Sequence, residues 1–317
     1  MKADDFDRWV RHELDAVEAA LEAWVPADAP AGLGGAMRYG VLNGGKRLRA
    51  LLVRAACEAV QGPAAAALRA AVAVELIHAY SLIHDDMPCM DDDVLRRGKP
   101  TVHVRYGQAQ AMLAGDAMQA LAFEVLTAPA GPGEGLGFDI APALQARLCS
   151  LLARSAGHAG MAGGQAIDLA SVGRSLDEGT LRDMHRRKTG ALLQASVLMG
   201  AACGDCPPAA WAALADYGAA VGLAFQVVDD ILDVTQESQT LGKTAGKDQH
   251  ANKPTYVSVL GLERSQAYAR ELLQQAQAAL DRTGLAEVRA LRALAEGDLA
   301  EPSRLVQLAE MLVERSS

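Results

Sequence analysis

The chain has 317 residues, a formal net charge of −9 and a hydrophobic fraction of 50%. The negative charge disfavours a general nucleic-acid binder, because contacts to phosphates need a basic face. Aromatic residues make up only 4% of the chain while Ala and Leu dominate, so the composition favours helices over sheets and predicts an all-α protein with a large core.

The composition also bears on the compartment. Charge, Gly or Pro interrupts the apolar runs before the ~20 residues needed to cross a bilayer, so no membrane span is expected. The first ten residues are acidic, unlike a signal peptide. The five cysteines are odd in number and lack framework spacing, and Cys203 and Cys206 are interpreted as an inert loop pair, with a redox or metal pair as the alternative. These features predict a soluble cytoplasmic protein.

In chain order, the first feature is an amphipathic helix over residues 4–24, ended by Pro26 and Pro30. A Gly44-Gly45 turn follows, with three cations in the next four residues, Lys46, Arg47 and Arg49. Exposed backbone N–H groups beside cations suit a diphosphate, although the spacing is not that of a Walker loop. The alternative is a loop that enters a basic helix.

Helices are predicted over residues 51–60 and 64–86, and the second of them runs into a set of aspartates. Five carboxylates fall within nine positions, at Asp85, Asp86, Asp91, Asp92 and Asp93. Charges this close repel one another by several kcal/mol, so either a solvated loop or bound cations must compensate. Because cationic side chains follow at once, the pattern predicts a metal-assisted site for a polyanion. A solvated acidic helix end is the alternative.

The middle of the chain reads as helices broken by glycine. A helix is predicted over residues 107–127, an exposed loop over 128–138, and a Gly-rich helical pattern over 141–170, where the glycines indicate close helix packing or a break. Asp177 and Glu178 are typical of the first turn of a helix. Beyond them, Lys188 and Thr189 lead into an apolar helix, where a lysine suits anion capture and surface charge is the alternative.

A helix predicted over residues 209–235 ends in a second set of aspartates. Asp229 and Asp233 are four residues apart and so lie on one helix face, roughly 5 to 6 Å from each other, where a cation could bridge them. Two such sets, each at the end of an apolar run, are hard to explain as surface charge. An EF-hand does not fit either of them, because the Gly and the distal Glu are missing.

The last part of the chain contains a Gly- and Lys-rich stretch over residues 240–256. This composition is typical of a lid that closes over phosphates, and a flexible linker is the alternative. Helices over residues 263–281 and 287–314 complete the pattern.

Taken together, these motifs resemble the trans-type isoprenyl diphosphate synthases, and most of all the bacterial farnesyl diphosphate synthases. The resemblance runs in family order from about Tyr39 to the C-terminus, through GGKRLR, DDMPCMD, LRRGKPT, GGQAID, KTG, FQVVDD and DDILD. It implies a single polyprenyl synthetase domain over residues 1–317, in which about ten or more helices surround a large central cavity. This is the isoprenoid synthase fold, usually assembled as a homodimer.

The resemblance also implies residue roles. The metal ligands would be Asp85, Asp91 and Asp229, which would hold about three Mg²⁺ ions. Asp86 and Asp233 would assist through metal-bound water, and Asp230 completes the catalytic set. The allylic diphosphate, dimethylallyl or geranyl, would bind with the help of Arg96, Lys188 and Lys243. Isopentenyl diphosphate would bind to Gly45, Lys46, Arg49, His78 and Arg97. Thr189, Gln226 and Lys253 would line the reaction path or contact phosphate.

Product length in this family follows from cavity depth. Tyr80 lies five residues before Asp85, roughly 7.5 Å farther along the helix, and Ser81 adjoins it. An aromatic residue there, with Pro88 and Cys89 inserted in the first Asp motif, is similar to the bacterial farnesyl type, so a C15 product is expected. Ala50 departs from the pattern, because many relatives have Pro at that position.

Three other functions remain open at this point. A geranyl or geranylgeranyl diphosphate synthase would share every ligand and differ in cavity depth. A terpene cyclase would lack DDILD and GGKRLR. A non-catalytic subunit of a prenyltransferase heteromer typically loses one Asp motif, whereas this chain has both.

Overall fold

The computed structural model describes residues 2–129, 140–174, 176–235, 254–285 and 303–313. Within these ranges the chain is almost entirely helical, with more than ten helices and a single two-stranded hairpin. The predicted all-α class is therefore confirmed. Most of the predicted lid, including Lys243 and Lys253, lies outside the described residues, as do residues 130–138 of the predicted exposed loop and 287–302 of the predicted last helix.

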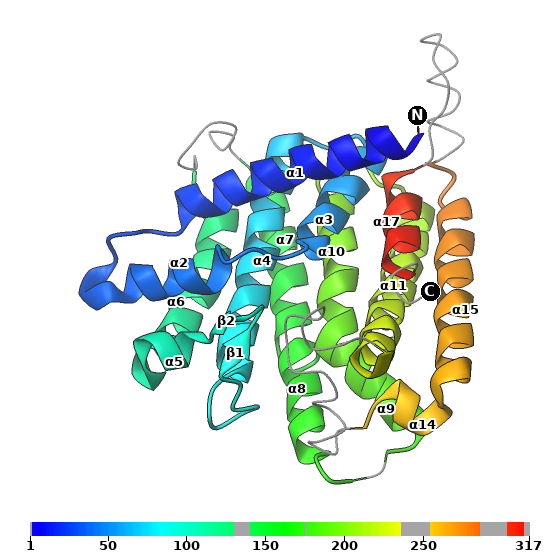
Figure 1. Cartoon of the computed structure of the whole chain (residues 1–317). Helices are drawn as coiled ribbons and strands as arrows, with labels where there is room; N and C mark the ends of the chain where they lie inside the picture. The colour runs from blue at the N-terminus through cyan, green and yellow to red at the C-terminus, as the bar shows by residue number, and fades with distance from the viewer. Residues whose placement is uncertain (1, 130–139, 175, 236–253, 286–302, 314–317) are drawn as a thin grey trace. The chain divides into compact units, whose positions relative to one another are not determined.

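The chain forms two compact units, and the first contains residues 1–54 and 63–150. Its elements are α1 (Lys2–Trp24), the short helix η1 (Pro30–Gly32), α2 (Leu33–Val41), the start of α3 (Leu48–Ala59), α4 (Ala64–Asp85), the strands β1 (Leu95–Arg96) and β2 (Lys99–Pro100), α5 (Val102–Tyr106), α6 (Gln108–Thr127) and most of α7 (Pro142–Ala156). Helix α4 packs lengthwise against α6, and α1 runs across α4 (Figure 1). The core of this unit is therefore built around α4.

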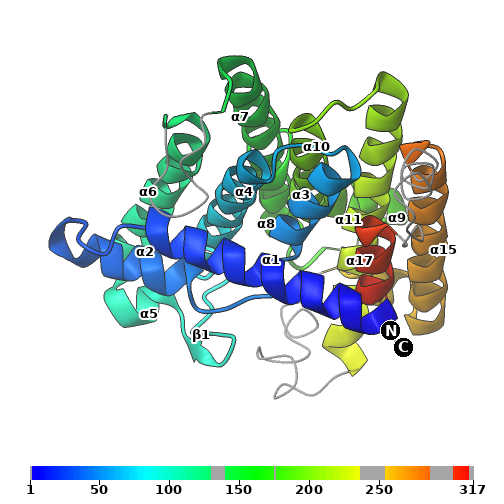
Figure 2. The same cartoon turned by 90° about the horizontal axis from the view of Figure 1, so that it is seen from above.

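The second unit contains residues 55–62 and 151–317. Its described elements are α8 (Met161–Ala170), α9 (Glu178–His185), the π-helix η2 (Arg186–Gly190), α10 (Ala191–Ala202), α11 (Pro208–Thr235), α14 (Tyr256–Leu260), α15 (Leu262–Asp281) and α17 (Arg304–Val313). Helices α11, α15 and α17 lie side by side, as seen from above in Figure 2, and α10 also packs on α11. Helix α11 is the central helix of this unit.

Most predicted helices begin and end within a few residues of their expected positions, because polar caps and glycines mark their ends. Asp177 caps α9 by accepting a hydrogen bond from the Thr180 backbone N–H at 2.9 Å. The Gly-rich stretch produces a break between α7 and α8, at residues 157–160. Helix α2 and the β1–β2 hairpin were not predicted. The hairpin turns through Arg97 and Gly98, which both adopt positive φ angles.

Helices α4 and α11 are long and apolar enough to cross a membrane, which differs from the expectation that no apolar run would reach that length. In α4, 78% of the apolar window is buried within the protein, and in α11 the share is 56%. A helix that is apolar on all sides can be buried in a protein core as well as in a membrane, so composition alone does not separate the two. The two charged side chains deep in α4, Arg69 and Glu75, are both bonded to other parts of the first unit.

Candidate active site

The first acidic loop folds back on the end of α4. The backbone N–H of Asp91 donates to the carbonyl of Asp85 at 2.9 Å, and that of Asp93 donates to the carbonyl of Asp86 at 3.1 Å. Asp92 takes a positive φ of 50° within this turn. Asp85 and Asp91 therefore share one turn, and both are half-buried. Two carboxylates in a single turn suit a divalent cation with oxygen ligands.

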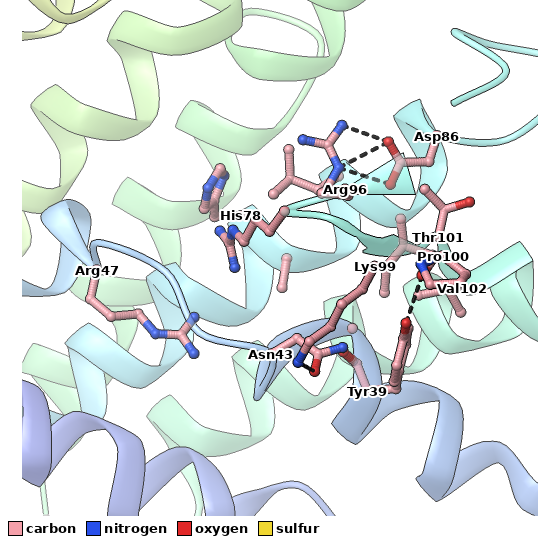
Figure 3. A pocket seen from close by; sticks show the side chains of 15 residues that line it. Tyr39, Asn43, Arg47, His78, Asp86, Arg96, Lys99, Pro100, Thr101 and Val102 are labelled. Carbon is pink, nitrogen blue, oxygen red and sulfur yellow. Dashed lines mark hydrogen bonds and ion pairs between the residues drawn. The ribbon is translucent and has the colours of Figure 1, made fainter. Parts of the chain in front are cut away.

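Asp86 is bonded differently from its neighbours in this loop. Arg96, on β1, donates from Nε to Oδ2 of Asp86 at 2.8 Å and from Nη2 to Oδ1 at 2.5 Å (Figure 3). Burial works against the charged guanidinium, but the hydrogen bonds and the charge of Asp86 outweigh it and raise the pKa of Arg96. Arg96 was predicted to bind the allylic diphosphate and Asp86 a metal-bound water. The structure pairs the two side chains with each other.

A pocket lies in the first unit, between α2, α4 and the hairpin (Figure 3). Its cationic lining consists of Arg47, Arg96, Arg97 and Lys99. His78 also lines it, and burial followed by the charges of nearby arginines lowers the pKa of His78 well below its ordinary value. His78 is therefore neutral at pH 7, and the positive charge of the pocket comes from fixed cations. Such a pocket suits an anionic ligand.

The Gly44-Gly45 turn lies against the same pocket. Both glycines take positive φ angles, of 78° and 152°, and Arg97 donates a hydrogen bond to the carbonyl of Gly44. A Cβ at Gly45 would lie 3.0 Å from the Arg97 guanidinium, so a larger residue would crowd that group. The turn and Arg97, which were predicted to share a diphosphate, therefore lie together.

Of the three cations after this turn, Arg47 points inward. Its Nε donates to Glu18 at 2.7 Å and its Nη1 to the buried Glu75 at 3.2 Å, and Glu75 also accepts the backbone N–H of Ala50 at 3.1 Å. Arg47 and Glu75 thus fix the start of α3. Sequence reasoning did not identify Glu75, although a lone acidic residue in an apolar helix was a signal that a buried cation needed a partner.

Lys46 and Arg49 flank Arg47 and differ in exposure. Lys46 is exposed, whereas Arg49 is buried, and burial lowers the pKa of Arg49 to about 10 although Glu75 opposes the change. The Nε of Arg49 has no hydrogen-bond partner among the described residues. A buried cation with an unused donor fits a bound anion, as the resemblance implies.

Tyr80 lies on α4 before the acidic loop, which begins at Asp85, and it is buried. Its ring meets the ring of His84 edge-on, with 5.7 Å between centroids. His84 Nε2 in turn donates to the carbonyl of Met112 on α6 at 3.1 Å, and only a glycine at position 115 leaves room for the imidazole. Ser81 donates to the carbonyl of His78 at 2.8 Å. No role for His84 followed from its sequence position, and the structure shows that it packs against Tyr80 on the same helix while bonded to α6.

In the second unit, the side chains of α11 form a continuous polar stripe. Gln226, Asp229, Asp230 and Asp233 follow one another at helical spacing. Thr189 of η2 donates to Gln226 Oε1 at 2.9 Å, and Gln226 Nε2 donates to Asp230 Oδ1 at 2.9 Å. The backbone N–H of Tyr256 donates to the other oxygen of Asp230 at 2.7 Å. Asp230 is buried, whereas Asp229 is half-buried.

The π-helix η2 presents Lys188 and Thr189 from successive positions. Lys188 Nζ donates to Asp168 on α8 at 2.5 Å, which gives the lone Asp168 a partner that the sequence did not reveal. A Cβ at Gly164 would collide with the backbone of Lys188, so α8 and η2 pack backbone to backbone. π-Helices are rare and often mark functional sites.

An aromatic cluster covers the outer end of this network. His185 stacks on Tyr256, with 5.3 Å between ring centroids, and Tyr268 lies 5.7 Å from Tyr256. Burial lowers the pKa of His185 to about 4, while the charge of Asp168 opposes the change and that of Lys188 reinforces it. The imidazole is therefore neutral at pH 7. Sequence reasoning missed the pairing of His185 with Tyr256, because a stacking contact between residues far apart in the chain leaves no local sequence signal.

The carboxylates present fit a Mg²⁺ site built with substrate rather than a closed protein cage. Among the described residues, no group of three or more His, Cys, Asp or Glu side chains converges. Mg²⁺ usually binds through one or two carboxylates together with substrate phosphates and waters. Asp85 with Asp91, and Asp229 with Asp233, each supply such a pair. The convergence of Asp85, Asp91 and Asp229 on shared ions stays a prediction.

Known proteins resemble this chain in sequence. Residues 31–293 match the sequence pattern of the polyprenyl synthetase family. A relative from Bradyrhizobium diazoefficiens, named a probable farnesyl diphosphate synthase, is 47% identical over 86% of this chain and 81% of its own length. The chloroplastic geranylgeranyl pyrophosphate synthase 11 of Arabidopsis thaliana is also 47% identical, over 86% of this chain and 76% of its own length.

A solved structure shows the same fold. The geranyltransferase of Helicobacter pylori, named as a complex with magnesium and isoprenyl diphosphate, matches with a TM-score of 0.78 and 32% identity. The match covers 97% of this chain and 96% of the other. The predicted isoprenoid synthase fold is thus confirmed.

Proposed function

This chain belongs to the polyprenyl synthetase family and is a prenyltransferase, and from that premise we propose that it condenses isopentenyl diphosphate with dimethylallyl and then geranyl diphosphate to give the C15 product, (2E,6E)-farnesyl diphosphate. The proposed C15 product length rests on the position of Tyr80. Its buried ring stands about one and a half turns before Asp85 and packs against His84, which is bonded to α6. A prenyl chain that grows along α4 from the acidic loop would meet this ring.

In the first unit, Arg97 of the pocket and the buried Arg49, whose charge acts on His78, bind the diphosphate of the isopentenyl substrate. Neutral His78 donates or accepts a hydrogen bond without adding charge. Lys46 is exposed beside the Gly44-Gly45 turn and reaches the same anion. Because Arg47 is committed to Glu18 and Glu75, it holds the turn in place rather than contacting the substrate.

The allylic substrate is bound by the acidic motifs. Magnesium, when bound, neutralises the departing diphosphate. We assign the ions to Asp85, Asp91 and Asp229, about three per active site, in keeping with the magnesium named for the Helicobacter pylori relative. Lys188 is held by Asp168 and adds a positive charge to the same diphosphate.

The proposed reaction needs no side-chain nucleophile. The allylic C1–O bond breaks and the diphosphate leaves with the electron pair, so that a carbocation forms at C1. The double bond of isopentenyl diphosphate attacks C1, and the new cation loses a proton, which the departed diphosphate accepts. The chain's own side chains bind both anions and keep water away from the cation.

The test is a product analysis with purified protein, dimethylallyl and isopentenyl diphosphates and Mg²⁺. We expect C15 as the main product and no product with chelator. Tyr80→Ala is expected to shift the product to C20 or longer, because truncation opens the space that the ring fills. Tyr268→Ala, a tyrosine truncation on α15 in the second unit, is the matched control and should leave C15 unchanged. A wild-type C20 product, or an unchanged distribution with Tyr80→Ala, would contradict the C15 proposal.

A second candidate is a geranylgeranyl diphosphate synthase, which the equal identity to the Arabidopsis relative favours. It uses the same residues, and the wild-type product analysis separates it from the first candidate. A non-catalytic subunit is disfavoured, because both Asp motifs and the basic turn are present. Failure of the purified chain alone to form any prenyl product would favour that reading.

We further propose that two copies assemble into a homodimer through α5 and α6. These helices carry three large exposed apolar side chains, Val104 (49%), Met112 (41%) and Leu113 (53%). Exposure of large apolar side chains to water is unfavourable, and contact with the same helices of a second copy would cover them. Leu113→Glu is expected to yield a monomer in light scattering, and Val172→Glu, at an exposed valine after α8, should remain a dimer. A dimer that survives Leu113→Glu, or a monomeric wild type, would contradict this surface.

We propose that the enzyme acts in the cytoplasm. All five cysteines are free thiols, as suits a reducing compartment. Fractionation of cells that express the full-length gene tests the location, and recovery in a membrane or secreted fraction would overturn it.

A further inference from the structure

Asp230 stands out among the aspartates of α11, because the chain itself occupies its carboxylate. One oxygen accepts the Gln226 amide N–H and the other accepts the backbone N–H of Tyr256, at 2.9 and 2.7 Å. Its residue surface is only 2% exposed. A carboxylate bonded on both oxygens and buried in this way is poorly placed to be a direct ligand of a metal ion.

The bond to Asp230 determines which way the Gln226 amide points. An ionised carboxylate only accepts hydrogen bonds, so the NH₂ end of the amide must face Asp230 and the oxygen end must face Thr189. Without that bond the two ends of the amide are nearly equivalent in shape, and its last torsion has two comparable wells. Asp230 therefore selects one of the two amide orientations.

This orientation in turn determines where the Thr189 proton lies. The hydroxyl of Thr189 has a single proton, which it donates to Gln226 Oε1. The lone pairs of Thr189 Oγ1 must then face the other way. If the amide were reversed, its N–H would donate to Thr189, and the hydroxyl proton would be free to point outward. An outward lone pair attracts a developing positive charge, and an outward proton repels it.

The position of this chain of bonds links it to the reaction. Thr189 directly follows Lys188, and Gln226 lies one helical turn before Asp229. We propose, on the basis of the function proposed above, that Asp230 is a positioning residue which acts through Gln226 to keep the lone pairs of Thr189 directed at the allylic carbocation. It does not bind metal or diphosphate itself.

The experiment is a double-mutant cycle on the full-length enzyme, with geranyl and isopentenyl diphosphates as substrates. Asp230→Asn is expected to lower kcat roughly 100-fold, the usual effect of losing one preorganised group, because the new amide no longer selects the Gln226 orientation. The KM values for both substrates and the Mg²⁺ concentration for half-maximal rate should stay within about threefold. A metal-binding role would raise the Mg²⁺ requirement instead.

The second arm removes the group through which Asp230 acts. In a Thr189→Val background, Asp230→Asn should cost less than about threefold, because no hydroxyl remains to be oriented. In a Thr189→Ser background, which keeps the hydroxyl, it should again cost roughly 100-fold. Asp229→Asn serves as the control for a metal ligand, and its effect should multiply with that of Thr189→Val.

Multiplicative effects of Asp230→Asn and Thr189→Val, or a raised Mg²⁺ requirement of Asp230→Asn, would overturn the inference. If Asp230→Asn does not fold, as judged by thermal unfolding, the cycle of Gln226→Leu with Thr189→Val replaces it, and multiplicative effects there overturn the inference equally. A wild-type enzyme that forms no prenyl product refutes the proposed function, whereas an active wild type with independent mutant effects refutes only the role of Asp230.

Discussion

The loop after α4 and the polar stripe on α11 each contain an Asp-Asp pair, and in both pairs the second aspartate is buried while the first is half-buried. Arg96 donates to Asp86, whereas the Gln226 amide and the Tyr256 backbone N–H donate to the two oxygens of Asp230. The first carboxylate holds an arginine in place, and the second holds an amide in one orientation. Similar sequence motifs thus use their second carboxylate for different purposes.

The supports beneath the two motifs also differ. In the first unit, the arginines around His78 are positioned by buried acids such as Glu75. In the second, the positions of Lys188 and Thr189 depend on close backbone packing at Gly164. The first region should therefore be sensitive to loss of charge, and the second to added volume.

The largest expected effect comes from the half-buried members of the pairs. Asp229→Asn should reduce kcat by roughly 1,000-fold or more, because a lost metal ligand removes several kcal/mol of charge stabilisation and each 1.4 kcal/mol is tenfold in rate. Steady-state kinetics at several Mg²⁺ concentrations measure it. Asp205→Asn, at an exposed position before α11, is the control and should be fully active. Wild-type activity of Asp229→Asn would contradict the comparison, because the half-buried member of the pair would then be dispensable.

The next effect tests the dependence of the second region on close packing. Gly164→Ala should lower the free energy of unfolding by about 3 kcal/mol, because the new methyl meets the backbone of Lys188 and neither helix can yield cheaply. Urea denaturation measures it. Gly35→Ala on α2 has its nearest neighbour 3.8 Å away and should be neutral or slightly stabilising. Equal stability of the two variants would show that η2 adapts to the methyl.

A smaller effect separates the partners of the Asp86–Arg96 pair. Arg96→Met should destabilise the protein by about 2 kcal/mol, because it leaves the buried Asp86 charge unpaired. Asp86→Asn should cost less than about 1 kcal/mol, since the Arg96 side chain is 34% exposed and regains water. Unfolding in urea at pH 7 compares them. The reverse order would mean that Arg96, not Asp86, is the member that depends on its partner.

The last effect concerns the neutral histidine of the second region. The folded-state pKa of His185, about 4, lies below its unfolded value of 6.5, so the unfolded chain takes up a proton first as the pH falls. The free energy of unfolding is therefore highest above pH 6.5 and falls toward pH 4. The expected loss between pH 7 and pH 5 is about 2 kcal/mol. His185→Phe should remove that part of the acid loss, whereas His158→Gln, at an exposed site, should not. Urea denaturation at the two pH values measures it, and identical slopes for wild type and His185→Phe would contradict it.

Local signals in the sequence predicted the helix ends and the chemistry of the candidate site. Helix ends followed from caps and glycines such as Asp177 and the Gly157–Gly160 break, because these act on the backbone of their own segment. The acidic pairs and the basic turn identified the chemistry and the family, because divalent ions and diphosphates require those groups at those spacings. The roles of the lid lysines and the convergence of Asp229 with Asp85 and Asp91 stay predictions.

Only the tertiary structure decided what each charged group bonds to. The pairing of Asp86 with Arg96, of Lys188 with Asp168 and of Arg47 with Glu75 joins residues from different elements, and no spacing along the chain encodes such contacts. The same holds for His84, which reaches across to α6, and for Asp230, whose partner Tyr256 is 26 residues away. Side-chain hydrogen bonds are short-ranged and directional, so they depend on where the folded helices bring their donors and acceptors.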